Sequence, residues 1–346
     1  MNKFYENLKS HDSALIECVP NVSTYLDSSL LERIKSFCGE HRHVHLLHIE
    51  KNTDAERSVI TVVGSPNGVF SFIDFLFKQL VGVIDINDYT GVHPSVGVVD
   101  VIPFIPLTGI ERSELLPLVE HFANYISFQH ELPIYFYGSM ASSENRRHLS
   151  QIRRGGLPVL KDRIDKKEFV PDIIPTKWNE NMGCSSITVR ELMVAFNIDL
   201  KTADVTKAQD IARCIRAVRD NETYFKQVDY PLLDHNDLLS LKALAWVMQG
   251  YGNCQISTNI YDPSSLTLED VFYLVKYISG QFGVAITGSE LIGVAPLKSF
   301  QSKTRGKSED DVISDIGLTI RGDFNKRARI LEYILKDKGI HNKGTF

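Results

Sequence analysis

The same order of predicted secondary-structure elements occurs twice along this chain, and this repeat restricts the fold more than any other feature. In the first half, apolar runs and helical spacing predict, in chain order, a strand at 14–20, a helix at 27–38, strands at 44–50 and 58–63, a helix at 69–83 and a strand at 98–105. In the second half, the same signals predict a strand at 191–198, a helix at 205–218, strands at 241–247 and 255–260, a helix at 268–282 and a strand at 285–294. Each half therefore reads strand, helix, strand, strand, helix, strand.

The strands that close the two halves also resemble each other in sequence. Residues 100–107 read DVIPFIPL, and residues 290–297 read ELIGVAPL. The element order is typical of ferredoxin-like units. We therefore predict an α/β (α+β) fold of two similar ferredoxin-like α/β subdomains with a cleft between them, formed by residues 1–189 and 190–346.

Several segments lie outside the repeat. The predicted additional elements are a helix at 113–130, a strand at 133–137, a short helix at 327–335 and a polar tail at 336–346. Residues 138–183 form a long polar stretch rich in Arg, Gly and Pro, a kind of segment that is usually functional or disordered. Residues 299–311 contain almost no apolar side chains, which predicts a flexible loop.

The composition is that of a soluble globular protein with room for two domains. The chain has 346 residues, of which 43% are hydrophobic, and a formal net charge of -5. No basic stripe is present, so we expect no nucleic-acid binding. The most apolar stretch, 69–86, is interrupted by Asp74, Lys78 and Gln79. It predicts a buried amphipathic helix rather than a membrane span, so we expect no membrane association.

The cysteines and the N-terminal residues favour a cytoplasmic protein. The five cysteines are an odd number without a C-x-x-C pair: Cys18, Cys38, Cys184, Cys214 and Cys254. This pattern fits reduced thiols better than a disulfide framework. Residues 1–10 lack the apolar core of a secretory signal peptide.

His93 is the first candidate for a catalytic side chain. It lies in a Gly/Pro turn directly before the apolar run at 98–105, where a rigid strand could hold it at a cleft. The unperturbed pKa of histidine, ~6.5, allows it to exchange protons near neutral pH. A loop histidine without a chemical role is the alternative interpretation.

Three other groups of residues suggest chemistry, each with a structural alternative. For the histidines of one strand region we favour a polar edge strand over a metal site: His41, His43, His45 and His48. Cys18 lies in an apolar run, which favours a buried thiol over a nucleophile. The arginines between Arg146 and Arg154 fit either a carboxylate site or a solvated surface. The sequence has no Walker loop, no helix-opening G-x-G-x-x-G and no G-x-S-x-G, which argues against the enzymes built on those motifs.

Several short motifs occur together in an order that identifies a family resemblance. They are 17–21 (ECVPN), 91–106, 135–138 (YFYG), 146–149 (RRHL), 195–197 (AFN), 255–259 (QISTN) and 288–293 (GSELIG). From Glu17 to about Leu335, the chain resembles the formiminotransferase family, the folate-dependent glutamate formiminotransferases. That family has two similar α/β subdomains, in agreement with the repeat.

The resemblance implies an enzyme of one-carbon metabolism and histidine degradation. The reaction would transfer a formimino group from N-formimino-L-glutamate to N5 of tetrahydrofolate, with tetrahydrofolate as the co-substrate and no metal. His93 falls on the family's catalytic histidine. In that role it would take the proton from N5 as general base and return one to the departing glutamate nitrogen as general acid.

The resemblance also assigns ligand-binding residues. The folate-binding loop falls on Ile174, Pro175, Thr176, Lys177, Trp178, Asn179, Glu180, Asn181, Met182 and Gly183. Within it, Trp178 would stack on a pterin or benzoyl ring, and Lys177 would meet a glutamate carboxylate. The positions assigned to substrate binding are Asn21, Glu50, Arg57, Arg153, Asn197 and Asn259; Arg57 and Arg153 would hold carboxylates.

The chain departs from the family pattern close to the catalytic histidine. Val92 replaces a glutamate and Ser95 replaces an arginine of the family's Gly-Glu-His-Pro-Arg-Met-Gly motif, and Ser139 replaces a glutamate further on. Removing charges there alters the electrostatics of the site. A diverged relative that acts on 5-formyltetrahydrofolate, or a non-catalytic folate-binding protein, therefore remains an alternative.

The resemblance also suggests partners. A homodimer is implied by the family. Some relatives are fused to a cyclodeaminase domain, and the short polar tail after Leu335 leads us to expect none in this chain. A separate cyclodeaminase would then process the product.

Overall fold

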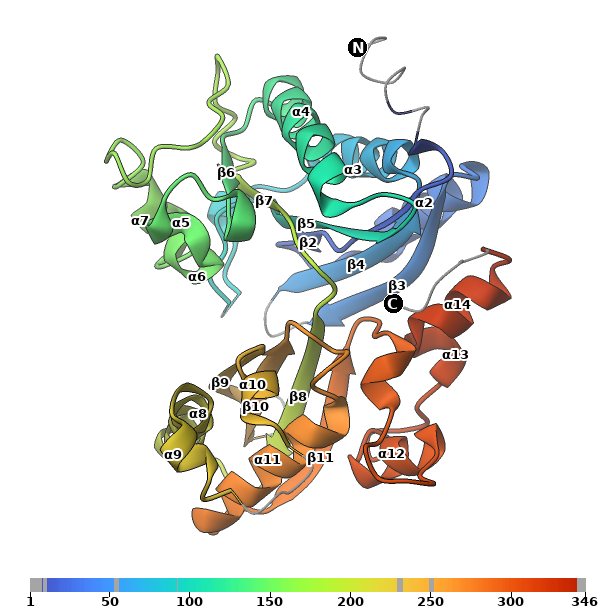
Figure 1. Ribbon diagram of the computed structural model, residues 1–346. Coiled ribbons are helices and arrows are strands. Elements are labelled where there is room, and N and C mark those ends of the chain that lie inside the picture. The colour runs from blue at the N-terminus through green and yellow to red at the C-terminus, as the bar shows by residue number, and fades with distance from the viewer. Residues whose placement is uncertain are drawn as a thin grey trace. The chain divides into compact units, whose positions relative to one another are not determined.

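A computed structural model describes residues 8, 11–52, 56–91, 93–228, 233–248 and 252–340 of the chain. The chain divides into two units, Met1–Arg190 and Glu191–Phe346 (Figure 1). Both units combine helices with a β-sheet, so the prediction of an α/β fold with two subdomains is confirmed.

The first unit begins with the predicted strand and helix order. Its elements are β1 (Leu15–Cys18), β2 (Asn21–Val22), α2 (Ser28–Glu40), β3 (Val44–Asn52), β4 (Arg57–Gly64), α3 (Pro66–Leu80) and β5 (Val99–Thr108). β1 and β2 form one strand line, interrupted at Pro20, which lacks the N–H that a ladder needs. This line lies between β4 and β5, and β3 pairs with the other side of β4; all of these pairings are antiparallel. The result is the strand order of a ferredoxin-like sheet.

Two further strands, β6 (Ile134–Phe136) and β7 (Ser185–Val189), extend this sheet to seven strands, and α4 (Arg112–His130) precedes them in the chain. β7 inserts between β5 and β6 and runs parallel to both. The sequence did not predict β7, since its residues, SSITV, are all buried and two of them are serines. The alternation of Ser186, Ile187, Thr188 and Val189 covers only four residues, the lower limit for a periodic strand signal. The strand predicted at 191–198 begins later, at Val194.

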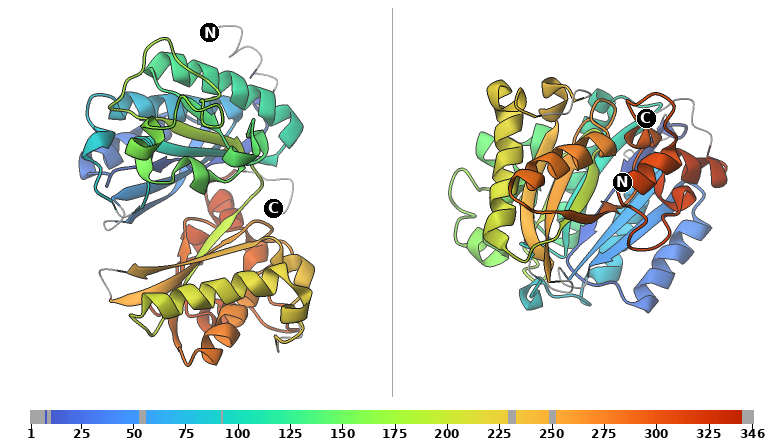
Figure 2. Two further views of the ribbon diagram at one scale, coloured as in Figure 1. Left: turned by 90° about the vertical axis from the view of Figure 1, so that its left-hand side faces the viewer. Right: turned by 90° about the horizontal axis from the view of Figure 1, so that it is seen from below.

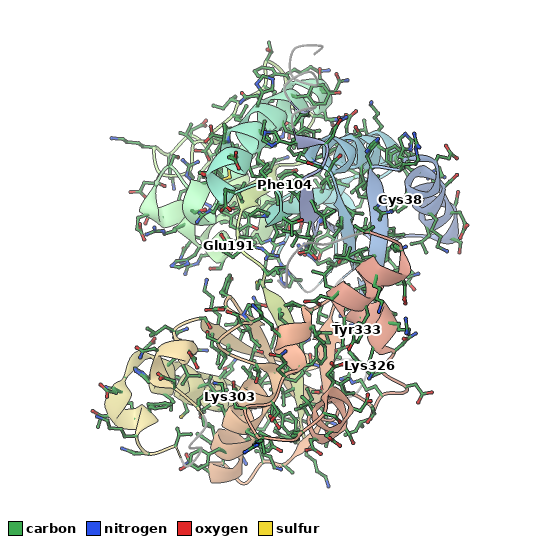
Figure 3. The ribbon with its side chains drawn as sticks, turned by 45° about the vertical axis from the view of Figure 1, so that its right-hand side comes forward. Cys38, Phe104, Glu191, Lys303, Lys326 and Tyr333 are labelled. Carbon is green, nitrogen blue, oxygen red and sulfur yellow. The ribbon has the colours of Figure 1, made fainter. Side chains whose placement is uncertain are left out.

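The helices α2, α3 and α4 lie on one face of this sheet (Figure 1). Aromatic rings fill the layer between helices and sheet. Phe70 stacks on Phe122 with 4.4 Å between ring centroids, and Phe70 meets the edge of Phe104 at 5.4 Å. Phe104 is labelled in Figure 3. All three side chains are completely buried, and such rings contribute much of the apolar area that stabilises a core.

The second unit repeats the ferredoxin-like arrangement. Its repeat elements are β8 (Val194–Leu200), α8 (Val205–Asp220), β9 (Leu241–Met248), β10 (Asn253–Ile260), α11 (Leu268–Gln281) and β11 (Ile286–Ile292). The strands are antiparallel in the order β11-β8-β10-β9, the same order as in the core of the first sheet. α8 and α11 cover one face of this sheet (Figure 2). Thr267 caps α11 in a capping box with Asp270.

Short helical segments connect the main elements. They are η2 (Ile86–Asp88), η3 (Gly138–Met140), α5 (Glu144–Arg147), α6 (Leu149–Ile152), α7 (Gly156–Lys161), α9 (Glu222–Phe225), α10 (His235–Leu238), η4 (Leu297–Phe300), α12 (Glu309–Asp315), α13 (Lys326–Arg329) and α14 (Leu331–Asp337). The predicted closing helix at 327–335 is thus two short helices. Lys326 and Tyr333, labelled in Figure 3, bond to Asp310 and Glu309 and so attach these helices to α12.

The segment predicted as a flexible loop, 299–311, is fixed by charged contacts. Lys303 lies 3.1 Å from both Asp237 and Asp270, and Lys307 pairs with Glu269. Glu269 and Asp270 are buried in the first turn of α11, where the helix dipole also favours negative charge. The prediction of a flexible loop is therefore wrong: these ion pairs and the completely buried Phe300 hold the segment, which overlaps η4 and α12.

Within the described ranges, no helix has the length and apolar character needed to cross a lipid bilayer.

Candidate functional site

His93 lies in the segment between η2 and β5. The hydroxyl of Tyr89 donates a hydrogen bond of 2.8 Å to the backbone oxygen of His93. Two residues further on, Ser95 is buried and its hydroxyl lies 2.5 Å from that of Ser23, which also donates to the backbone oxygen of Gly97. These contacts fix the turn on both sides of the imidazole. Val92, the other departure from the family motif, lies outside the described residues.

The segment that follows His93 contacts the predicted folate-binding loop directly. Gly97 and Gly183 form an isolated β-bridge, with backbone hydrogen bonds from Val98 to Met182 and from Cys184 to Val96. The two backbone segments approach so closely that a Cβ on Gly97 would lie 1.9 Å from the backbone oxygen of Cys184. Gly183 also has a positive φ of 68°, which glycine adopts without strain. The fold thus joins two segments that are far apart in the sequence.

A buried charge cluster lies beside the imidazole of His93. Nη1 of Arg57 is 3.2 Å from Nδ1 of His93. Nη2 of Arg57 donates to Oδ2 of Asp100 at 2.8 Å, and Nε donates to Oδ1 of Asn21 at 3.1 Å. Arg153 donates to the same carboxylate oxygen of Asp100. The structure therefore brings four predicted site residues together: Asn21, Arg57, His93 and Arg153.

Asp100 is a member of this charge cluster that was not predicted from the sequence. It is completely buried in β5, and its second oxygen accepts from the backbone N–H of Val96. A signal was present, because a lone carboxylate within an apolar strand must find a positive partner. Its partners, Arg57 and Arg153, are 43 and 53 positions away in the sequence, so their pairing could not be derived from spacing.

The arginines between Arg146 and Arg154 have separate roles. Arg153 contributes to the charge cluster at His93. Arg146 is buried and pairs with Asp172 at 2.9 Å, and it also donates to the backbone oxygen of Val170. It thereby attaches the long polar segment to β6. Arg147 forms an exposed pair with Glu144. The three arginines therefore have different environments: Arg153 and Arg146 form buried or partly buried ion pairs within the protein, and Arg147 lies at the surface. Ligand binding by Arg153 stays a prediction.

The charges of this cluster change the pKa values of its members. Burial would raise the pKa of the Asp100 carboxyl, but the charges of Arg153 and Arg57 outweigh burial and hold it below its usual value. Burial and the neighbouring Arg153 lower the pKa of Arg57 to about 10, so it remains charged at neutral pH. Burial, Arg57 and Arg153 together lower the pKa of His93 to about 4. At neutral pH the imidazole is therefore neutral.

A pocket of about 330 Å³ opens beside His93. Its lining comes from two segments: Ile86, Asn87, Tyr89, Gly91, His93, Pro94 and Ser95 from the first, and Gly155, Gly156, Leu157 and Pro158 from the second. A backbone hydrogen bond of 3.0 Å from Leu157 to Ser95 ties the two segments together. Two guanidiniums and one carboxylate lie next to this pocket, so the local charge favours anionic ligands.

The predicted folate-binding loop, 174–183, is ordered by its own contacts. Trp178 is half-buried, donates from Nε1 to the backbone oxygen of Gly183 at 3.0 Å, and carries Lys161 over its ring at 5.5 Å. The ammonium of Lys177 lies 3.4 Å from Glu131, although most of its side chain is exposed. Ligand contacts of Trp178 and Lys177 stay predictions.

Three predicted site residues lie outside the charge cluster: Glu50, Asn197 and Asn259. Glu50 in β3 and Asn21 in β2 both lie opposite Val59, so they share one sheet face about 10 Å apart. Oε2 of Glu50 accepts from Nε2 of His48 at 3.0 Å. Asn197 and Asn259 belong to the second unit, on the face of its sheet away from the buried Ile256. Oδ1 of Asn197 is buried without a partner among the described residues.

The other candidates show no reactive geometry. Cys18 is completely buried, and burial together with the charge of Glu17 raises the pKa of its thiol, which keeps it protonated. Among the residues that the structure describes, no three His, Cys, Asp or Glu side chains are grouped to hold a metal ion. Ser139 donates to the backbone oxygen of Val189 at 3.0 Å and so supports the end of β7.

Comparisons with known proteins match both units. Residues 15–190 match the formiminotransferase domain, N-terminal subdomain, and residues 195–336 match the formiminotransferase domain. The chain is 26% identical over 340 residues to the formimidoyltransferase-cyclodeaminase of Mus musculus and 28% over 346 residues to that of Gallus gallus. These alignments cover 94% and 95% of this chain but only 61% and 62% of the relatives. A glutamate formimidoyltransferase of Streptococcus pyogenes serotype M1 is 26% identical over 285 residues, 82% of this chain and 90% of that protein.

Proposed function

Because the chain belongs to the formiminotransferase domain family, we propose that it transfers a formimino group from N-formimino-L-glutamate to N5 of tetrahydrofolate. The name of the Streptococcus pyogenes relative, glutamate formimidoyltransferase, supports this donor. Tetrahydrofolate acts as co-substrate. The cyclodeaminase part of the animal relatives suggests that a cyclodeaminase consumes the product.

The observation that carries this proposal is a neutral imidazole at a pocket beside a net positive charge. Formimino transfer forms a bond from N5 to the formimino carbon and breaks the bond from that carbon to the glutamate nitrogen. N5 loses one proton and the glutamate nitrogen gains one. His93 is the side chain that exchanges protons or hydrogen bonds with these nitrogens, and its low pKa keeps it neutral for this purpose.

The positive charge next to the pocket supports binding of the carboxylates. Arg57 and Arg153 share one carboxylate, that of Asp100, so one positive charge is left over beside His93. Formiminoglutamate and folate both carry carboxylates, and such a field raises their local concentration. Arg57 and Arg153 thus act mainly as a charge source that is fixed in the protein, rather than as mobile clamps.

Folate binding is proposed for the loop at 174–183. Its backbone bridge to Gly97 joins it to the His93 segment. Trp178 offers an aromatic surface for the pterin or benzoyl ring. Replacing Trp178 by Ala without loss of tetrahydrofolate affinity would exclude this contact. A cytoplasmic homodimer remains part of the proposal, to be examined by sedimentation and by fractionation.

The proposal is tested by mixing the purified protein with tetrahydrofolate and formiminoglutamate and measuring glutamate release. The variant His93→Ala should lose release, whereas His121→Ala, an exposed histidine of α4, should retain it. No release from the unmodified protein would refute the transferase function. Bound folate without turnover would indicate a non-catalytic relative, and release of formate equivalents from 5-formyltetrahydrofolate would indicate a different donor.

A further inference from the structure

Two contacts of His93 favour opposite protonation states of the same ring nitrogen, Nδ1. Nδ1 lies 3.2 Å from Nη1 of Arg57 and 3.1 Å from the backbone oxygen of Pro94. In a neutral imidazole, one nitrogen carries a proton and donates, and the other accepts. The guanidinium has only donors, so its contact is attractive when Nδ1 is bare. The carbonyl only accepts, so its contact is attractive when Nδ1 carries the proton.

The fixed position of Arg57 favours the state in which Nδ1 carries no proton. Its side chain is 7% exposed, and its planar group is fixed by Asn21 at Nε and by Asp100 at Nη2. Nη1 therefore cannot turn away from the imidazole without breaking a buried ion pair. A proton on Nδ1 would place two N–H groups against each other, one of them on a cation. A charge-assisted hydrogen bond is about twice as strong as a neutral one.

The contact with the backbone oxygen of Pro94 favours a protonated Nδ1 only weakly. Pro94 directly follows His93, so covalent geometry keeps its carbonyl near the ring in either state. The repulsion between a bare Nδ1 and this oxygen involves two neutral groups. The repulsion between Nδ1–H and the guanidinium involves a full positive charge in a buried place, where electrostatic interactions are stronger.

We propose that Arg57 is a positioning residue that holds neutral His93 with its proton on Nε2, so that Nε2 meets a ligand in the pocket as a hydrogen-bond donor. Nε2 is the nitrogen on the ring edge away from Arg57 and Pro94. Asp100 supports this arrangement by fixing Arg57. The consequence for the reaction rests on the proposed function: His93 first donates a hydrogen bond to the substrate, and the base role expected from the sequence would need the other tautomer.

The tautomer is measured by long-range nitrogen–hydrogen correlation NMR on protein with ¹⁵N-labelled histidine at pH 7. The variant His93→Gln identifies the signals of His93 by their loss. We expect a protonated, pyrrole-type Nε2 and a bare, pyridine-type Nδ1. In Arg57→Met, which has an apolar side chain of similar length, we expect the proton to move to Nδ1, facing Pro94. Arg147→Met, which removes an exposed arginine, should leave the tautomer unchanged.

A protonated Nδ1 in the unmodified protein, or an unchanged tautomer in Arg57→Met, overturns the proposal. The histidines other than His93 report whether Arg57→Met folds, and Arg57→Lys, which keeps the charge without the planar group, serves as a second variant if it does not.

The NMR result does not depend on turnover. Absence of glutamate release with a protonated Nε2 therefore refutes the proposed function alone, and release with a protonated Nδ1 refutes this inference alone. Where release is present, Arg57→Met should lower kcat by about 100-fold, whereas a purely structural role would change stability without a tautomer change.

Discussion

Asp100 and Arg57 form an ion pair with 2.8 Å between Oδ2 and Nη2, in which the carboxylate side chain is 0% and the arginine side chain 7% exposed. Arg153 pairs with the same oxygen. One carboxylate from β5 therefore holds two guanidiniums, one from the start of β4 and one from the end of α6. Through Arg57, this pair reaches Nδ1 of His93, so the electrostatics of the candidate catalytic residue depend on a strand residue that does not line the pocket.

Replacing Asp100 by Asn should destabilise the first unit by about 3–5 kcal/mol. The change leaves Arg57 and Arg153 buried next to each other without a compensating charge, which is the costly way to break a buried pair. Urea unfolding followed by circular dichroism measures the effect. Glu144→Gln, which removes the partner of Arg147 in an exposed pair, should cost less than about 1 kcal/mol. Equal losses in the two variants would contradict the role of Asp100.

His93 should titrate near pH 4 rather than near pH 6.5. Its pKa is lowered to about 4 in the folded protein, whereas the unfolded chain keeps the ordinary value, ~6.5. Between these values the unfolded state binds a proton that the folded state does not. Stability should therefore fall as the pH drops through this window, by up to about 1.4 kcal/mol per pH unit.

An NMR titration of the His93 ring measures this directly, and urea unfolding at several pH values measures the linkage. His93→Gln should remove this part of the pH dependence of stability. A midpoint of the ring titration near 6.5 would show that burial, Arg57 and Arg153 together do not lower the pKa of the imidazole. Glutamate release should show no ionisation of His93 between pH 6 and 8.

Gly97→Ala should disturb the contact between the His93 segment and the loop at 174–183. The new Cβ would lie 1.9 Å from the oxygen of Cys184, so the backbone must shift, at a cost of about 1–3 kcal/mol. We expect lower stability and weaker folate binding. Gly280→Ala is the matched control, because no atom lies within 4 Å of its Cβ and it sits in α11. It should raise stability by about 0.5–1 kcal/mol. Normal folate binding by Gly97→Ala would contradict the proposed coupling.

Lys307→Met should release the segment before α12. Lys307 pairs with the buried Glu269 and with Asp315. Its removal leaves the negative charge of Glu269 buried without this partner, which should lower the free energy of unfolding by about 3 kcal/mol. Trypsin cleavage after Arg305 and urea unfolding measure the change. Lys326→Met, which removes a more exposed pair with Asp310, should change stability by less than about 1 kcal/mol. Unchanged cleavage after Arg305 would show that other contacts hold the segment.

Some element boundaries could be read from local signals and others could not. The start of α11 at Leu268 agrees with the helix predicted at 268–282, because the capping box of Thr267 and Asp270 acts within three positions. The helix predicted from residue 69 begins earlier, at Pro66, because Ser65 caps it and proline fits its first turn. β7 was missed, since its burial comes from neighbours β5 and β6 rather than from its own pattern.

The sequence by itself determined the repeated order of elements, the two-subdomain α/β fold and the position of His93 in a turn before a strand. These features depend on periodicity and turn chemistry, which act over a few residues. Only the tertiary structure decided that Asp100 holds Arg57 and Arg153, that Gly97 meets Gly183, and that the imidazole of His93 is neutral. The physical reason is that burial and charge pairing depend on distances in space between residues that are far apart in the chain.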